Sequence, residues 1–432
     1  MDYTDRARRL FLETGTKFPR RVIWAMGLLK YAYAKANYGL GLIDAKRAAA
    51  IMEAARKVAE GTLDREISVD VFQTGSGTGL NMNLNEVIAA EASRLAGVQV
   101  HPNDHVNMGQ SSNDVVPSAI RIAAYFEAKE GVLKGLDGII EALREKEVEH
   151  RDVVKAGRTH LRDALPVTLG QELGAYADAF EHDRKYLLDV LEYVKELPLG
   201  GTAVGTGANA PKELGLKVIE EINAETGADF KRANPFRAMR LLTDLLLLSS
   251  IFRNIAIELY RLGQDLRLMF SGPFTGIGEI ELPTQEEVPG SSIMPGKTNP
   301  VTVEAVMLAA VQIAGLDQAN AVASALGEFE LSMGIPLMGF NIVGQAQLLS
   351  EALKKFTEYA VRGLKPHVEK MRNYAENSPA LITALAPVVG YEKATELAKK
   401  ISKGTSIKKA LEELGLNPEE LVERLAGLRS GG

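Results

Sequence analysis

The fold of this chain depends on the stretch Gly-Ser-Ser-Ile-Met-Pro-Gly-Lys-Thr-Asn-Pro at residues 290–300. Residues 271–300 contain five glycines and five prolines, a density that the interior of a helix or strand does not tolerate. The segments on both sides carry the apolar spacing of long helices, so the stretch is predicted to be a loop between two rigid rods. Loops of this length are usually functional or disordered. A flexible linker is the alternative, but a linker does not need Ser, Lys and Asn at fixed offsets.

The side chains of this loop suit a reaction in which negative charge develops on a bound oxygen. Serine is a weak base until its alkoxide is stabilised, and a nearby ammonium group and freed backbone N–H groups can stabilise it. Lys297 offers the positive charge and Asn299 offers fixed donors, as in an oxyanion site. The glycines would allow the loop to close over a ligand and open again.

Five long helical patterns make up most of the remaining chain. They cover residues 115–143, 165–196, 235–270, 301–326 and 337–364. The third has no internal proline and is predicted to be one helix of roughly 54 Å. Strand signals are scarce, and shorter helices are expected near both ends. Five such helices predict a bundle longer than one subunit usually builds, with surface left to bury against partner chains.

A glycine-rich loop at residues 73–79 leads into a helix that begins near Asn81 and continues to Leu95. A glycine loop that enters a helix N-terminus is an anion-binding arrangement, which suggests a carboxylate or phosphate site. A simple turn and helix cap explains the loop equally well. The loop does not match a dinucleotide-binding fingerprint, because no βαβ pattern precedes it and its second glycine is misplaced.

Two further polar turns carry candidate functional side chains. Residues 110–114 place two serines and an asparagine before a helix, which is more hydroxyl and amide than an N-cap needs, although capping is the simpler interpretation. Residues 157–164 contain His160 beside Thr159 and an arginine. A lone histidine is more often structural than catalytic, but its position in a polar loop favours a functional role.

Residues 101–107 form a third polar segment, in which His101 and His105 lie four positions apart. Two histidines at this spacing can bind a metal ion when they share one face of a helix. Pro102 and the Asn and Asp residues of the segment argue against a helix, so metal binding is not expected.

Composition excludes several classes of protein. The chain has 432 residues, a formal net charge of −6 and no cysteine, so disulfides, thiol nucleophiles and thiolate metal sites are excluded. The acidic balance argues against nucleic acid or an anionic membrane as the main partner. The N-terminus lacks the apolar core of a signal peptide, and the most apolar run, at residues 245–251, is too short to span a bilayer. A cytoplasmic protein is therefore expected.

Three separated blocks of the sequence resemble the fumarase/aspartase superfamily, and the resemblance covers about residues 20–425. The blocks are Thr78 within its glycine loop together with Ser111-Ser112-Asn113, then Gly157-Arg158-Thr159-His160, and finally residues 290–300. The resemblance implies an all-α fold with a central five-helix bundle that forms a core of about 20 helices in a tetramer. It also implies that each active site draws these blocks from three chains. The expected domains are residues 1–109, 110–365 and 366–432.

The resemblance further implies a reaction that releases fumarate by reversible elimination. Ser291 would remove a proton from the carbon beside a carboxylate, and Lys297 and Asn299 would stabilise the resulting aci-carboxylate. His160, paired with Glu304, would handle the leaving hydroxyl as water. The residues implied in substrate binding are Ser76, Thr78, Ser111, Ser112, Asn113, Thr159, Lys297 and Asn299. A second, non-catalytic dicarboxylate site near the surface is implied at His101, Asn103 and Asp104. No cofactor and no metal are implied.

Three functions are compatible with this resemblance. Ser111-Ser112-Asn113, Gly296 and the loop at residues 200–207 favour the hydration of fumarate to L-malate. Thr298 and Met108 depart from the usual pattern of that branch. Aspartate ammonia-lyase activity, which forms fumarate and ammonia, is the first alternative. A catalytically inert structural homologue is the second, but it would be expected to have lost catalytic side chains that are all present here.

Overall fold

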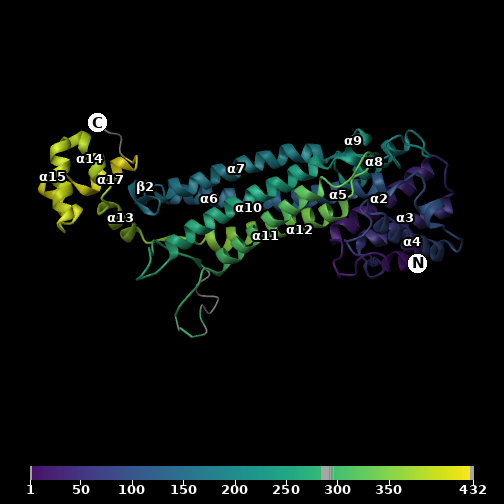
Figure 1. The fold of residues 1–432 in the computed structure, drawn as a ribbon, viewed down its shortest axis with the longest axis horizontal. Coiled ribbons are helices and arrows are strands. Elements are labelled where there is room, and N and C mark those ends of the chain that lie inside the picture. The colour runs from purple at the N-terminus through teal and green to yellow at the C-terminus, as the bar shows by residue number, and fades with distance from the viewer. Residues whose placement is uncertain (1, 284–290, 292, 295, 429–432) are drawn as a thin grey trace. The chain divides into compact units, whose positions relative to one another are not determined.

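The computed structural model describes residues 2–283, 291, 293–294 and 296–428. The chain divides into two compact units. Unit 1 consists of Met1–Lys134, Asp183–Ala256 and Ala310–Glu351, and unit 2 consists of Gly135–His182, Ile257–Ala309 and Ala352–Gly432. Each unit combines segments that are far apart in the sequence. Figure 1 shows the elements of the whole chain in order.

The described residues are mainly helical, as predicted. The α-helices of unit 1 are α1 (Asp2–Arg8), α2 (Arg20–Gly39), α3 (Ala45–Glu60), α4 (Thr78–Ala96), α5 (Ser112–Glu127), α8 (Leu214–Thr226) and α9 (Pro235–Arg240). The helices with residues in both units are α6 (Leu133–Glu149), α7 (Leu169–Val194), α10 (Thr243–Phe270), α11 (Val301–Ala323) and α12 (Ile335–Phe356). Unit 2 also contains α13 (Val368–Glu376), α14 (Leu381–Val389), α15 (Tyr391–Ser402), α16 (Ile407–Glu413) and α17 (Pro418–Leu425).

The strands are few and short. They are β1 (Val154–Thr159), β2 (Arg162–Thr168), β3 (Glu196–Leu197), β4 (Lys231–Arg232), β5 (Ile280–Glu281) and β6 (Lys365–Pro366). Within the described residues they form three two-stranded sheets, β1-β2, β3-β4 and β5-β6. Short irregular helical turns complete the elements: η1 (Asp64–Glu66), η2 (Pro102–Val106), η3 (Ala128–Val132) and η5 (Thr357–Val361).

Two predictions about the long helices were wrong. The pattern at residues 235–270 is two helices, α9 and α10, because Leu241 is extended (φ −116°, ψ 129°). The carbonyl of Leu241 accepts a hydrogen bond from the Arg121 side chain instead of from the next helical turn. The helix expected from residue 165 begins at Leu169, because the preceding residues form strand β2.

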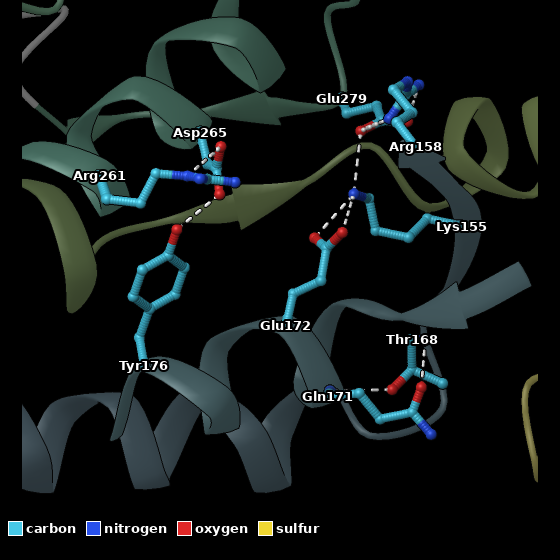
Figure 2. A network of polar contacts seen from close by, with 9 residues as sticks. All are labelled: Lys155, Arg158, Thr168, Gln171, Glu172, Tyr176, Arg261, Asp265 and Glu279. Carbon is cyan, nitrogen blue, oxygen red and sulfur yellow. Dashed lines mark hydrogen bonds and ion pairs between the residues drawn. The ribbon is translucent and has the colours of Figure 1, made fainter. Parts of the chain in front are cut away.

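The antiparallel hairpin of β1 and β2 was missed. Its register pairs Val154 with Thr168 at the open end and Thr159 with Arg162 at the tip. A reciprocal cap then separates the hairpin from α7: the backbone N–H of Thr168 donates to Gln171 Oε1, and the backbone N–H of Gln171 donates to Thr168 Oγ1, each at 3.0 Å (Figure 2). A Thr-x-x-Gln capping box is a helix-start signal, and it was available in the sequence.

A buried polar network joins α10, α11 and α12 within unit 1. Ser249 Oγ donates to Asp317 Oδ1 at 2.7 Å. Asn320 Nδ2 donates to Gln345 Oε1 at 3.1 Å, and Asn341 Nδ2 donates to Asn320 Oδ1 at 3.0 Å. All five side chains are buried. Because an unpaired buried polar group is costly, the network favours one register of these helices over slipped alternatives.

A buried ion pair links α5 to the start of α10 in unit 1. Arg121 is fully buried, and its Nε and Nη2 donate to the two carboxylate oxygens of Asp244 at 2.7 and 3.0 Å. Arg121 also donates to the carbonyls of Pro117 and Leu241. The guanidinium therefore depends on Asp244 for charge compensation.

We expect Asp244→Asn to lower the free energy of unfolding by about 3–5 kcal/mol, because it leaves the Arg121 charge buried and uncompensated. The measurement is urea unfolding at one fixed protein concentration. Glu130→Gln is the matched control, since it breaks the solvent-exposed pair with Arg21 and should cost only about 0–1 kcal/mol. Equal effects of the two substitutions would contradict the role assigned to burial.

The C-terminal helices of unit 2 pack around their own apolar cluster. Its buried members come from α13 to α17, from β1 and from the C-cap of α17: Val154, Ala375, Leu381, Leu385, Leu397, Ile407, Ala410, Leu411, Leu421, Val422 and Ala426. This is consistent with a small helical assembly after residue 366. The three-domain division of the whole chain stays a prediction.

Helix α11 is unusual because it is apolar but poorly covered. Among the residues that the structure describes, it is the one helix long and apolar enough to cross a membrane, and 33% of its most apolar window is buried. Leu308, Val311 and Val322 are 74%, 60% and 63% exposed. Asp317, in contrast, faces the polar network of unit 1. These three side chains are candidates for contact with another molecule.

Candidate active site

The predicted carboxylate-binding residues of unit 1 meet where two helices begin. Thr78 opens α4, and Ser112 opens α5. Thr78 Oγ1 lies 2.9 Å from Ser112 Oγ and 2.7 Å from Ser76 Oγ. The N-cap of α4 is Gly77, in the left-handed region at φ 75°, and Gln73 Oε1 accepts the backbone N–H of Leu80 in the first turn at 2.9 Å. Two helix N-termini and three hydroxyls at one place suit a carboxylate.

The turn at residues 110–114 is a helix cap as well as a candidate binding segment. Ser111 Oγ accepts a hydrogen bond from the backbone N–H of Asn113, and Asp114 completes a capping box with the backbone N–H of Ser111. Asn113 donates from Nδ2 to the carbonyl of Ala203. The capping interpretation of Ser111 is therefore confirmed. Ser112 and Asn113 follow it in the chain, and they contact Thr78 and the carbonyl of Ala203 respectively.

Asp114 connects this turn to the loop at residues 200–207, a role that sequence reasoning missed. Its buried carboxylate accepts backbone N–H groups from Ser111, Gly200 and Thr202 at 3.0, 3.2 and 2.9 Å. Burial raises the pKa of Asp114 to about 7, while the backbone donors act in the opposite direction. Thr202 has φ 54°, which is costly for a β-branched residue. The carboxylate thus holds a strained loop beside the serines.

Lys30 is a second functional candidate that the sequence did not reveal. It lies on α2, is fully buried, and donates from Nζ to three amide oxygens: Asn81 Oδ1 at 2.7 Å, Asn107 Oδ1 at 3.2 Å and Gln110 Oε1 at 2.8 Å. Burial lowers the pKa of Lys30 to about 7, and Asp114 acts in the opposite direction. Three acceptors match the three hydrogens of an ammonium group, whereas a neutral amine has only two.

His160 lies at the tip of the β1-β2 hairpin in unit 2. The tip is a two-residue turn in which His160 and Leu161 have φ 55° and 58°. Turns of this type normally use Asn or Gly, because both central residues take positive φ. Two ordinary side chains in this conformation store strain, and they project from the turn with Leu161 70% exposed. Such strain at an exposed tip is typical of a functional position.

A charged network surrounds Lys155 and Arg158 of strand β1, as Figure 2 shows. Arg158 donates from Nη1 and Nη2 to the two carboxylate oxygens of Glu279 at 3.1 and 2.7 Å. Lys155 donates to both oxygens of Glu172 at 2.7 Å and lies 3.6 Å from Glu279. Glu279 is fully buried, and burial raises the pKa of Glu172. These charges fix the strand that leads to Thr159 and His160.

A cavity of about 290 Å³ opens beside this network in unit 2. Its lining includes Lys155, Arg158, His160, Glu172, Arg261 and Asp265. Tyr176 Oη donates to Asp265 at 2.6 Å, and Figure 2 shows this pair across from the lysine. Burial, together with this hydrogen bond, raises the pKa of the Tyr176 hydroxyl. The histidine therefore borders a polar, partly enclosed space.

The described part of the loop at residues 290–300 presents Ser291 in a tight turn. Ser291 Oγ accepts backbone N–H groups from Met294 at 3.0 Å and Ile293 at 3.3 Å. Lys297 is exposed, and the carbonyl of Asn299 accepts the N–H of Val301 at the start of α11. Gly290, Ser292 and Pro295 lie outside the described residues. Neither Ser291 nor Lys297 forms a recorded hydrogen bond or ion pair with His160.

Glu304 lies on the first turn of α11, where its carboxylate is 3.4 Å from Arg267 Nη2. Both residues line a second cavity of about 570 Å³ in unit 2, together with Thr298 and Pro300. Leu161, next to His160, lines both cavities. No hydrogen bond or ion pair between Glu304 and His160 is recorded, so their pairing stays a prediction.

The proposed second dicarboxylate site lies in unit 1 on the turn η2. The expectation that this segment is not helical was wrong: Pro102 occupies the first position, where its missing N–H has no cost. His101 Nδ1 accepts the N–H of Asp104, and His105 Nδ1 accepts the N–H of His101. Asn103 and Asp104 are exposed. His101 and Asp104 therefore stabilise the turn, and their binding role stays a prediction.

Comparison with known proteins gives consistent results along the chain. The family model described as Lyase matches residues 1–315, and the model described as Fumarase C C-terminus matches residues 381–428. Fumarate hydratase class II of Saccharolobus solfataricus is 63% identical over 98% of this chain and 96% of its own. Fumarate hydratase class II of Xylella fastidiosa is 43% identical over 99% of this chain and 91% of its own. The crystal structure of class II fumarase from Schistosoma mansoni superimposes with a TM-score of 0.91 at 34% identity, covering 98% of this chain and 93% of that one.

Proposed function

This chain belongs to the class II fumarases of the fumarase/aspartase superfamily, and we propose that it hydrates fumarate reversibly to L-malate with Ser291 as the base. The observation that carries this assignment is the environment of Ser291 Oγ, which accepts backbone N–H groups from Ile293 and Met294. Donors directed at an oxygen stabilise its alkoxide. A serine held in this way can accept a proton from carbon.

The remaining side chains account for the other steps in the malate-to-fumarate direction. Ser291 takes the proton from the carbon beside a carboxylate, and the electron pair of that C–H bond moves into the carboxylate to form the aci-carboxylate. Lys297 and Asn299 stabilise the added charge. The C–O bond then breaks, and His160 supplies the proton with which the hydroxyl leaves as water. Hydration of fumarate follows the reverse sequence.

The hydroxyl cluster of unit 1 binds the substrate carboxylates. Thr78 lies within hydrogen-bond distance of Ser76 and Ser112, so their hydroxyls can turn to donate to one carboxylate at the two helix N-termini. Ser111, Asn113 and Thr159 complete the binding set. His101, Asn103 and Asp104 form the separate dicarboxylate site. No step requires a cofactor.

We assign the enzyme as a homotetramer in which three chains complete each active site. The exposed apolar face of α11 supports this assignment, because it leaves Leu308, Val311 and Val322 uncovered and subunit contacts would bury them. The exposed position of Lys297 supports it as well, because a partner chain can then reach the loop. The acidic, cysteine-free composition fits a cytoplasmic location.

A fumarate absorbance assay tests the reaction directly. Purified protein is given L-malate in one cuvette and L-aspartate in another, and the ultraviolet absorbance of fumarate is followed. We expect fumarate from malate only. Fumarate from aspartate only would identify an ammonia lyase, and no product from either would favour the inert structural homologue.

A further inference from the structure

The hydroxyl cluster of unit 1 contains no positive charge that would attract its proposed carboxylate ligand. Its members are all uncharged, yet the proposed ligand is an anion. They are Ser76, Thr78, Ser111, Ser112 and Asn113. Lys30 is fully buried, and its ammonium donates to residues that neighbour this cluster in the chain. Its acceptor Asn81 lies three residues after Thr78 on the first turn of α4, and its acceptor Gln110 immediately precedes Ser111.

The environment of Lys30 is unusual for a buried charge. Buried charges are normally paired with an opposite charge, because uncompensated burial is costly. Here the three recorded acceptors are neutral amide oxygens, and no ion pair of Lys30 is recorded among the described residues. The carboxyl group of Asp114 acts on the pKa of Lys30, but it already accepts three backbone N–H groups. The positive charge is thus held by dipoles and remains available to a neighbouring anion.

The amides around Lys30 also connect the two segments of the cluster. Asn81 Nδ2 donates to Asn107 Oδ1 at 3.1 Å, and Asn107 Nδ2 donates to the carbonyl of Gln110 at 3.2 Å. One ammonium therefore fixes the first turn of α4 against the turn that leads into α5. Any change of charge at Lys30 acts on both helix N-termini at once.

We propose that Lys30 is a positioning residue for the substrate, a buried ammonium that in its charged form draws a dicarboxylate to the Thr78–Ser112 subsite. This inference rests on the proposed function of that subsite. Lys30 would then contribute to the selectivity for anions without touching the substrate. Removing the charge of Lys30 should therefore weaken substrate binding. It should affect proton removal less, because Ser291 lies on another segment of the chain.

Asn81→Asp is the decisive variant, because it keeps the size of the side chain and places a carboxylate 2.7 Å from the ammonium. A purely structural Lys30 would gain an ion pair, and KM would stay the same. We expect instead that KM for fumarate and the Kd of the non-reacting dicarboxylate succinate rise at least about tenfold, because the field of the ammonium is neutralised. Asn83→Asp is the matched control. It adds the same charge on the same helix, where Asn83 contacts the backbone of Glu66 and Ser68, and it should leave KM unchanged.

Lys30→Met provides the second test, since it removes the charge itself. We expect the same rise in KM, with a smaller change in kcat. Lys195→Met is its control, because Lys195 is also buried but is paired with Asp229. A folded Asn81→Asp or Lys30→Met variant with KM and succinate Kd within about twofold of wild type would overturn the proposal. Calorimetric binding of succinate separates this result from a failure of the reaction assignment, which would appear as a wild-type protein without turnover.

Discussion

Ser291→Ala is expected to abolish turnover while leaving the fold, the oligomer and succinate binding intact. General-base catalysis by one side chain typically contributes about 10²–10⁴-fold, and here the proton leaves a weakly acidic carbon, so at least this loss is expected in kcat. The geometry supports the assignment, because the two backbone N–H groups at Ser291 Oγ belong to Ile293 and Met294 of the same turn. Alanine removes the acceptor of these donors and no core contact.

The experiment measures kcat and KM with L-malate and with fumarate. A fall in kcat with KM nearly unchanged is expected, because the proposed carboxylate-binding residues of unit 1 are unaltered. Ser402→Ala is the matched control, since that hydroxyl only donates to the carbonyl of Lys399 at the end of α15. If Ser291→Ala retains more than about a tenth of wild-type kcat, Ser291 is not the base.

The sequence predicted the helices well because apolar periodicity is a local signal. It predicted α11 within a few residues, since the pattern at residues 301–326 corresponds to the helix Val301–Ala323. It failed at Leu241, where the carbonyl is taken by Arg121, 120 residues earlier in the chain. No local pattern encodes such a contact. The β1-β2 hairpin was missed for a different reason, since His160 and Leu161 occupy a turn that local preference assigns to Asn and Gly.

The candidate site residues also differ in whether a local sequence pattern could reveal them. Ser291, His160 and the hydroxyl residues were singled out as candidates because each occupies a polar loop between apolar segments, and their roles stay predictions. Lys30 was not singled out because it lies within a helical pattern. The role of Asp114 was missed although it ends a polar turn, because its partners Gly200 and Thr202 are distant in the chain. The contacts from Lys30 to Asn81 and Gln110 span 51 and 80 residues. The role of a buried charged residue can be recognised only when the fold shows which distant residues contact it.

Mixing two inactive variants is expected to restore activity, and this is the sharpest test of a site shared between chains. Ser291→Ala and His160→Asn each remove one essential group, so each homotetramer should be inactive. If Ser291 and His160 of one active site come from different chains, some sites of a hybrid tetramer contain both native residues. With random assortment of equal amounts, the chain that provides Ser291 is the His160→Asn variant half of the time, and independently the chain that provides His160 is the Ser291→Ala variant half of the time. About one quarter of the sites should therefore be active.

The hybrid is made by dissociating the two variants together and reassembling them, with each variant alone as the control. Light scattering should give a tetramer in all three samples. The structure makes the expected outcome physically reasonable, since His160 stands at a strained, projecting hairpin tip and Lys297 is exposed on its loop, and both can meet a partner chain. If both residues of a site came from one chain, no assortment could unite them, and the mixture would stay as inactive as its parents. Recovery near one quarter of wild-type activity would instead require that the two residues reach each site from separate subunits.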